Sequence, residues 1–135
     1  MTDNLYTEIL LDEYKNLQNK GEMPNADLVL EGSNSNCGDN ITIYIKVQSP
    51  NDKSQIKEIT WEGEGCVISQ VAVSLLSKKL KEKKIKIRDI EKFSGQDMLE
   101  LLGLEQISPG REKCLMLGLE TIKKANLSTL LETSL

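Results

Sequence analysis

The segment from Asn40 to Gln48 constrains the fold of this chain most strongly, because apolar and polar residues alternate along it without a break. The apolar members are Ile41, Ile43, Ile45 and Val47, and the polar members are Thr42, Tyr44, Lys46 and Gln48. A period of two predicts a half-buried strand. The turn-forming stretch Ser49–Asp52 follows, and then a further strand candidate, Gln55–Glu62. Because the connection is so short, we expect an antiparallel pair.

A third strand is predicted over Asp27–Gly32, where Leu28-Val29-Leu30 forms a compact apolar run. In the segment Gln55–Glu62, Ile59 and Trp61 share one face, but Ile56 falls out of phase with them. This irregularity indicates a β-bulge or a later start of the strand.

The rest of the chain has the spacing of helices. We expect helices over residues 5–16, 67–80, 87–93, 96–102 and 110–125, with 126–135 as a frayed tail. The basic run Lys78–Lys86 is interpreted as a solvated helix end. Strands followed by helices predict an α+β fold in which helices pack on one face of a three-stranded antiparallel sheet. The length of 135 residues suits a single domain, residues 1–135.

Composition excludes several classes of function. The chain has no histidine, which excludes a histidine-based triad and every histidine-containing metal site. Its net charge of −4 argues against nucleic acid as the main partner. No apolar run is long enough to span a membrane, and the acidic N-terminus does not resemble a secretory signal. We therefore expect a cytoplasmic protein whose three cysteines do not form a disulfide framework.

The cysteines lie in contexts that favour chemistry. Cys37 and Asp39 are separated by Gly38 in a polar loop, which allows the thiolate and the carboxylate to face one point. Cys66 follows Gly65 directly before a predicted helix, whose positive dipole end favours the thiolate.

Cys114 stands in the last helix beside Arg111 and Lys113, two cations that also favour the thiolate. Lys113 is also a candidate ion-pair partner of Asp39 in the absence of metal.

Other interpretations of these residues stay open at this point. Each cysteine is compatible with a role as a small buried hydrophobe, most readily Cys114 among leucines. The glycine-rich stretch Gly63–Gly65 is compatible with a phosphate cradle, although its glutamates repel phosphate and no Walker-type lysine follows. Spacing alone does not bring the three cysteines together.

Three motifs, taken together, resemble those of the IscU/SufU/NifU N-terminal family of iron–sulfur cluster assembly proteins. They are Asn36-Cys37-Gly38-Asp39, Gly63-Glu64-Gly65-Cys66-Val67-Ile68-Ser69 and Arg111-Glu112-Lys113-Cys114. The segment Tyr14–Gly21 is similar to the family's N-terminal Tyr-x-Asn-Pro-x-Asn-x-Gly element. The resemblance covers about residues 5–125 and implies a SufE/NifU-like fold.

The resemblance also implies a site. Cys37, Asp39, Cys66 and Cys114 match the family's metal ligands, with Cys37 and Cys114 as candidate sulfur acceptors. The residues expected to surround the ligands are Lys113, Arg111, Gly38 and Gly65. The implied cofactor is a labile [2Fe–2S] cluster, with zinc as the alternative occupant. The implied partners are a cysteine desulfurase, acceptor apoproteins or cluster carriers, and further copies of the chain, without nucleic acid or membrane.

Two departures from the family pattern shape the functional hypotheses. Lys113 stands where the IscU branch has histidine, as in SufU-like members, and the Leu-Pro-Pro-Val-Lys chaperone-binding motif is absent, which argues against an Hsp70-type partner. The first hypothesis is a non-enzymatic scaffold that assembles and transfers clusters. The alternatives are a zinc-dependent sulfurtransferase that accepts persulfide and a structural zinc site in a small adaptor.

Overall fold

The structure is a computed structural model that describes residues 2–34 and 38–134, with side chains described for residue 8 and from residue 10 to residue 126 outside the gap. Its elements are α1 (Thr2–Lys15), β1 (Leu28–Asn34), β2 (Asp39–Ser49), β3 (Asp52–Glu64), α2 (Val67–Glu82), the 3-10 helix η1 (Ile87–Lys92), α3 (Gly95–Leu102), the 3-10 helix η2 (Pro109–Arg111) and α4 (Glu112–Ser134).

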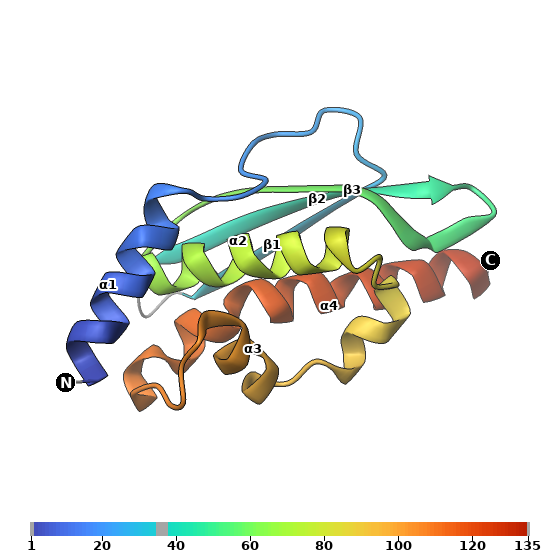
Figure 1. Cartoon of the computed structure of the whole chain (residues 1–135). Helices are drawn as coiled ribbons and strands as arrows, with labels where there is room; N and C mark the ends of the chain where they lie inside the picture. The colour runs from blue at the N-terminus through green and yellow to red at the C-terminus, as the bar shows by residue number, and fades with distance from the viewer. Residues whose placement is uncertain (1, 35–37, 135) are drawn as a thin grey trace.

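The three strands form an antiparallel sheet in the order β1-β2-β3, and α2 and α4 lie side by side against one face of it (Figure 1). The segment between α1 and β1 crosses on the side of the sheet away from these helices, while α3 lies beyond them. This arrangement confirms the predicted fold class. The alternating strand pattern had predicted a sheet with one buried face and one partly solvated face.

The register of β2 and β3 explains why Ile56 is out of phase. Lys46 pairs with Glu58, but the next residue, Val47, pairs with Ile56, so Lys57 is the extra residue of a bulge. The bulge returns Ile56 to the buried face, where it is 7% exposed. The sequence expectation of an irregularity at this point is confirmed.

The core between sheet and helices is mainly aliphatic, with Trp61 as its large aromatic side chain. Ile43 and Trp61 are cross-strand partners and are both fully buried. Where α2 and α4 meet, a Cβ added at Gly118 would lie 3.0 Å from the Cβ of Val73. The small residue on α4 thus allows the two helices to approach closely, which sets the positions of their N-termini.

The segment that follows α1 is anchored between α2 and the edge of β3. The backbone of Asn19 accepts a hydrogen bond from Trp61 N, and Gly21 N donates to Trp61 O, as in a short extra strand. The side chain of Asn19 donates to Ser77 Oγ at 3.1 Å, and Gln18 N donates to Ser74 Oγ. The N-terminal motif seen in the sequence is therefore a set of anchoring contacts.

The last helix differs from its prediction. It was expected over residues 110–125, but η2 occupies the first of these positions and α4 runs from Glu112 to Ser134. Pro109 starts the 3-10 turn and so delays the α-helix. No helix in the described ranges 2–34 and 38–134 is both long and apolar enough to cross a membrane.

Tyr44 also departs from the simple alternation, because it lies on the polar face of β2 and is nevertheless buried. Its hydroxyl donates a hydrogen bond to Glu62 Oε2 at 2.9 Å. This hydrogen bond, together with desolvation and the nearby carboxylates, raises the pKa of Tyr44 above the ordinary tyrosine value of 10.0.

The raised pKa of Tyr44 predicts a pH effect. The neutral phenol is the donor, so its contribution to stability is fully present below about pH 10 and is lost as the pH rises through the raised pKa. We expect Tyr44→Phe to remove a late ionisation step above pH 10 from an ultraviolet titration. Tyr14→Phe, on exposed surface, is the control. A lost step that occurs no later than the one lost in Tyr14→Phe would contradict this assignment.

Candidate metal and sulfur site

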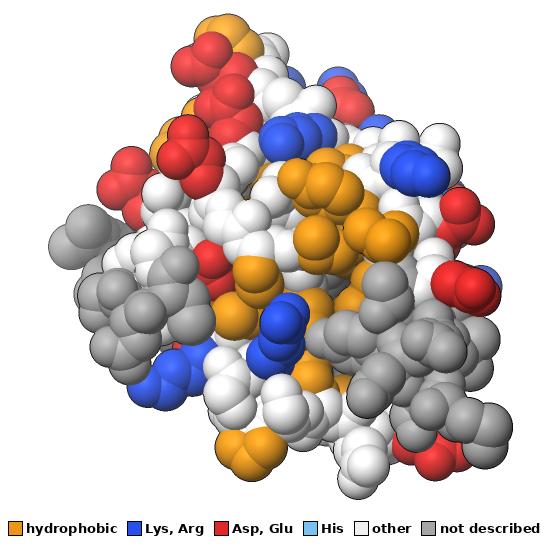
Figure 2. Space-filling view, turned by 90° about the vertical axis from the view of Figure 1, so that its left-hand side faces the viewer, with side chains coloured by type: hydrophobic (Ala, Val, Ile, Leu, Met, Phe, Trp, Pro, Cys, Tyr) orange, Lys and Arg blue, Asp and Glu red, His pale blue; other side chains and the backbone are white. Residues whose placement is uncertain are grey.

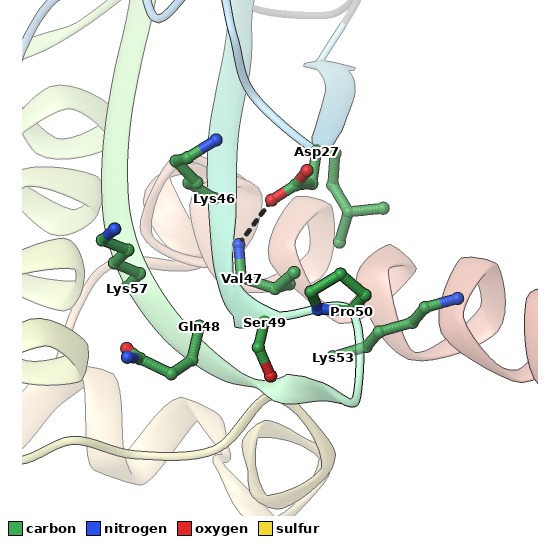
Figure 3. Close-up of a pocket in the computed structure, with 9 residues that line it drawn as sticks. Asp27, Lys46, Val47, Gln48, Ser49, Pro50, Lys53 and Lys57 are labelled. Atoms are coloured by element: carbon green, nitrogen blue, oxygen red, sulfur yellow. Dashed lines mark hydrogen bonds between the residues drawn. The ribbon is translucent and has the colours of Figure 1, made fainter.

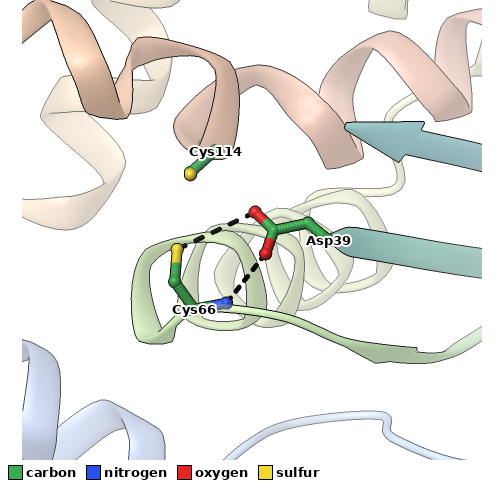
Figure 4. Close-up of side chains that lie close together, drawn as sticks. All are labelled: Asp39, Cys66 and Cys114. Atoms are coloured by element: carbon green, nitrogen blue, oxygen red, sulfur yellow. Dashed lines mark hydrogen bonds between the residues drawn. The ribbon is translucent and has the colours of Figure 1, made fainter. Parts of the chain in front are cut away.

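Asp39, Cys66 and Cys114 come together at one end of the sheet (Figure 4). One carboxylate oxygen and the two Sγ atoms all lie within 4.8 Å of one another. Asp39 and Cys114 are buried, while Cys66 is partly exposed. The three side chains come from segments far apart in the sequence, so the tertiary fold creates this cluster.

The elements that carry these residues all begin at the cluster. Asp39 is the first residue of β2, Cys66 is the N-cap of α2, and Cys114 lies in the first turn of α4. The unpaired N–H groups and the dipole of a helix N-terminus favour negative charge nearby. Two helix N-termini therefore surround a group of potential anions, which is a setting suited to thiolate ligands.

The carboxylate of Asp39 connects the strand to the helix. Its Oδ1 accepts a hydrogen bond from the backbone N of Cys66 at 3.0 Å, while its Oδ2 lies 3.9 Å from Cys66 Sγ. Because the carboxylate is 2% exposed, burying it requires such a partner. The bond to the backbone holds one oxygen in place and leaves the other directed toward the two sulfurs.

The separation of the three donor atoms fits a metal. Tetrahedral coordination with Zn–S bonds of about 2.3 Å and Zn–O bonds of about 2.1 Å places neighbouring donors about 3.6 to 3.8 Å apart. The distance of 3.9 Å between Cys66 Sγ and Asp39 Oδ2 is already close to this value. Thiolates are soft ligands suited to zinc and iron–sulfur clusters, and the carboxylate adds a harder ligand.

Gly65 is required at its position by both backbone conformation and space. Its φ is +155°, and a Cβ added there would overlap the Asp39 carboxylate and lie 2.9 Å from Ser69 Oγ. Gly38, with φ +71°, supports the turn before Asp39, but a Cβ there would meet nothing within 4 Å. Of the two predicted glycines, Gly65 thus directly shapes the cluster.

Two polar residues of α2 that were not among the predicted site residues support the Cys66 loop, although Ser69 ends the second sequence motif. Ser69 Oγ donates to Cys66 O at 3.0 Å and lies 3.9 Å from Cys66 Sγ. Gln70 Nε2 donates to Gly65 O at 3.0 Å, while its Oε1 accepts from Lys20 Nζ at 3.2 Å. Their spacing of three and four residues after Cys66 was a usable signal, because such positions share a helix face.

Lys20 extends this support to the N-terminal segment. Its ammonium lies 5.4 Å from the centre of the Trp61 ring, which places the charge over an aromatic face. The contacts from Trp61 through Lys20 and Gln70 to Gly65 connect the sheet edge with the cysteine loop. The loop is thus supported by the Asp39 carboxylate on one side and by Gln70 on the other.

The remaining predicted site residues differ in their outcome. Cys37 lies outside the described residues, so its place as a ligand stays a prediction. Arg111 and Lys113 are exposed. Among the ion pairs of the described residues none joins Lys113 to Asp39, whose Oδ1 is instead bonded to a backbone N–H.

The surface around the cluster end combines apolar and basic character. Figure 2 shows hydrophobic side chains gathered at the centre of this end of the molecule, with Lys and Arg side chains next to them and carboxylates toward the edges. Such a surface suits contact with another protein, because apolar area is exposed within a charged rim.

A separate cavity of about 410 Å³ lies at the other end of the sheet, around the β2–β3 turn (Figure 3). It is lined by Asp27 and three lysines, among other residues, and Asp27 Oδ2 accepts a hydrogen bond from Val47 N. The labelled lysines Lys46, Lys53 and Lys57 point in different directions and do not converge on one point. The cavity is therefore distinct from the Asp39–Cys66–Cys114 cluster.

Comparison with known proteins defines the class to which this fold and cluster correspond. The family model described as the NifU-like N terminal domain matches residues 5–129, which is nearly the whole chain. The chain therefore belongs to the NifU-like N-terminal domain family.

Its relatives carry two kinds of name. The iron–sulfur cluster assembly scaffold protein IscU of Thermotoga maritima is 31% identical, with 90% of this chain and 92% of the relative covered. The zinc-dependent sulfurtransferase SufU of Bacillus subtilis is 29% identical, with 90% and 89% covered. The chain is thus similar to these two relatives to nearly the same degree.

Solved structures agree with the fold. A putative iron–sulfur cluster assembly scaffold protein for the SUF system from Fervidobacterium islandicum superposes with a TM-score of 0.69 at 26% identity, over 87% of this chain and 93% of that one. A NifU-like N-terminal protein from Brucella abortus gives 0.72 at 15% identity, over 93% and 94%, which supports the fold alone.

The close approach of Gly65 to Asp39 predicts that Gly65→Ala disrupts the arrangement of Asp39, Cys66 and Cys114. The new methyl group displaces the carboxylate and also strains the backbone, at a cost of about 1–3 kcal/mol. We expect a lower melting temperature and zinc affinity reduced at least roughly 10-fold in competition with a chelator dye.

Gly21→Ala is a matched control, because Gly21 has φ +151° but a Cβ there would meet nothing within 4 Å. Gly21→Ala is expected to lose stability only because alanine is strained at this φ, and to keep its zinc affinity. Equal zinc affinity in both variants would show that Gly65 does not shape the metal site.

Proposed function

We propose that this protein is a scaffold for iron–sulfur cluster assembly that holds a labile [2Fe–2S] cluster and passes it to acceptor proteins. The observation that carries the proposal is the meeting of Asp39, Cys66 and Cys114 within 4.8 Å at the N-termini of two helices. Membership of the NifU-like N-terminal domain family and relatives named as assembly scaffolds support it. Cys37 is proposed as the remaining ligand.

The ligand set suits a cluster that must leave. Thiolates bind iron firmly, whereas a carboxylate is a weaker ligand for an iron–sulfur cluster than a fourth thiolate. The backbone N–H of Cys66 holds Oδ1 of Asp39, while Oδ2 accepts only a long contact of 3.9 Å from the Cys66 thiol, so Oδ2 is able to bind or release iron without movement of the backbone. A scaffold needs this property, because a cluster held by four thiolates would be harder to transfer.

Sulfur is proposed to arrive from a cysteine desulfurase as a persulfide. An acceptor thiolate attacks the outer sulfur of the desulfurase persulfide, and the desulfurase thiolate leaves as the new persulfide forms. Of the two candidate acceptors, Cys114 is 3% exposed, which favours Cys37 as the first to be reached. The apolar and basic surface at this end of the molecule supports docking of such a partner.

The alternative function is a zinc-dependent sulfurtransferase. It is favoured by Lys113 directly before Cys114, a feature that resembles SufU-like members, and by the relative that bears this name. Zinc would be held by the same thiolates and carboxylate, and a cysteine would leave the metal to accept sulfur. In this case the protein is an enzyme, whereas the scaffold is a carrier.

Anaerobic purification with metal and sulfide analysis tests the two functions against each other. We expect iron and acid-labile sulfide in equal amounts, with charge-transfer absorption in the visible range, if the protein is a scaffold. Stoichiometric zinc that resists exchange, together with faster turnover of a cysteine desulfurase, would instead support the sulfurtransferase. A purified protein that contains neither iron with sulfide nor zinc would contradict both functions.

The role of Asp39 as a releasable ligand predicts that Asp39→Ala lengthens the lifetime of the bound cluster. An apo-ferredoxin or a chelator is added to the loaded protein, and the loss of the cluster from the protein is followed by the change in visible absorption. We expect the half-life of the cluster on the protein to be several-fold longer in the variant. Asp89→Ala, which alters an exposed carboxylate of η1, is the control. A half-life that is unchanged or shorter in Asp39→Ala would show that the carboxylate does not make the cluster exchangeable.

A further inference from the structure

Asn34 lies next to the Asp39–Cys66–Cys114 group, although no motif pointed to it. It is the last residue of β1 and pairs directly with Asp39 in the antiparallel register. Directly opposite residues place their side chains on the same face of the sheet, with Cβ atoms about 4.5–5.5 Å apart. Asn34 is 8% exposed and Asp39 is 2% exposed, so both lie on the face that the helices cover.

The amide of Asn34 has donors that the described polypeptide does not use. Its Nδ2 is buried and has no hydrogen-bond partner among the described residues. A buried donor without an acceptor is unfavourable, and such groups are uncommon in folded proteins. The neighbouring Asp39 does not relieve it, since its Oδ1 receives Cys66 N and its Oδ2 lies toward the sulfurs.

We propose that Asn34 is a positioning residue whose side-chain N–H donates a hydrogen bond to a sulfur atom at the metal site. The acceptor is a metal-bound thiolate or a sulfide of the cargo, both of which carry negative charge in the loaded protein. This inference rests on the proposed function, because it requires a metal bound by the thiolates. It gives the unused donor an acceptor of suitable charge at the place where Asp39, Cys66 and Cys114 meet.

The chemical effect of such a bond is specific. An N–H donor near sulfur withdraws electron density from it, which changes the energy of sulfur-to-metal charge transfer and the reduction potential of a cluster. A residue that merely fills space or supports the loop produces neither effect. The spectrum of the bound metal therefore separates the proposed role from a structural one.

The test replaces Asn34 with leucine, which has nearly the same shape and no donor. The probe is Co²⁺ added alone to the metal-free full-length protein, and the readouts are the thiolate-to-cobalt absorption bands and the Co²⁺ dissociation constant. The matched control is Asn40→Leu, because Asn40 adjoins Asp39 on β2 but is exposed. The melting temperature of each metal-free protein is measured in parallel.

We expect Asn34→Leu to shift the charge-transfer bands to longer wavelength and to weaken Co²⁺ binding roughly 10-fold. The metal-free variant should melt at the same or a higher temperature, since an apolar group replaces a buried donor that had no partner. Asn40→Leu should leave both the bands and the affinity unchanged.

The inference is overturned if Asn34→Leu has the spectrum and the affinity of the unaltered protein. It is also overturned if this variant is destabilised or unfolded without metal, because the amide would then serve the polypeptide itself. Failure of the metal site on which the proposed function depends looks different: the unaltered protein would then show no thiolate-to-cobalt bands at all, whatever residue stands at position 34.

Discussion

The hydrogen bond from the backbone N–H of Cys66 to the carboxylate of Asp39 is the interaction on which the arrangement of the site depends. It joins the first residue of β2 to the N-cap of α2, and so brings a buried carboxylate to a helix N-terminus. The bond compensates for the removal of the charge from water and also sets the direction of the second oxygen. The absence of a side chain at Gly65 leaves the room that this contact needs.

The rest of the fold supports this one contact. Close packing of α2 on α4 at Val73 and Gly118 places the first turn of α4, and with it Cys114, beside the start of α2. On the other side, Lys20 and Gln70 connect the segment after α1 to the carbonyl of Gly65. The site is therefore formed where a strand, two helices and an anchored N-terminal segment meet, and it depends on all four.

Local stability and function make opposite demands at this end of the molecule. A buried carboxylate and a side-chain N–H with no partner among the described residues each cost free energy in the metal-free chain, and a glycine loses more backbone entropy on folding than other residues do. The same three features are useful if sulfur and metal are bound there, since they provide a ligand, space for it and a donor. Away from the site, Ile43, Trp61 and Leu119 are fully buried apolar side chains that contribute to stability without such a cost.

The sequence by itself determined the sheet, its antiparallel order and the helical layer, because a period of two and a helical period are local properties of the chain. It also indicated the irregularity at Ile56 and, through the family resemblance, predicted Asp39, Cys66 and Cys114 as metal ligands. Only the tertiary structure decided the burial of Tyr44 and Asn34 and the support of the Cys66 loop by Gln70. Burial and hydrogen bonding depend on residues distant in the chain, and neither spacing nor composition records which of them become neighbours.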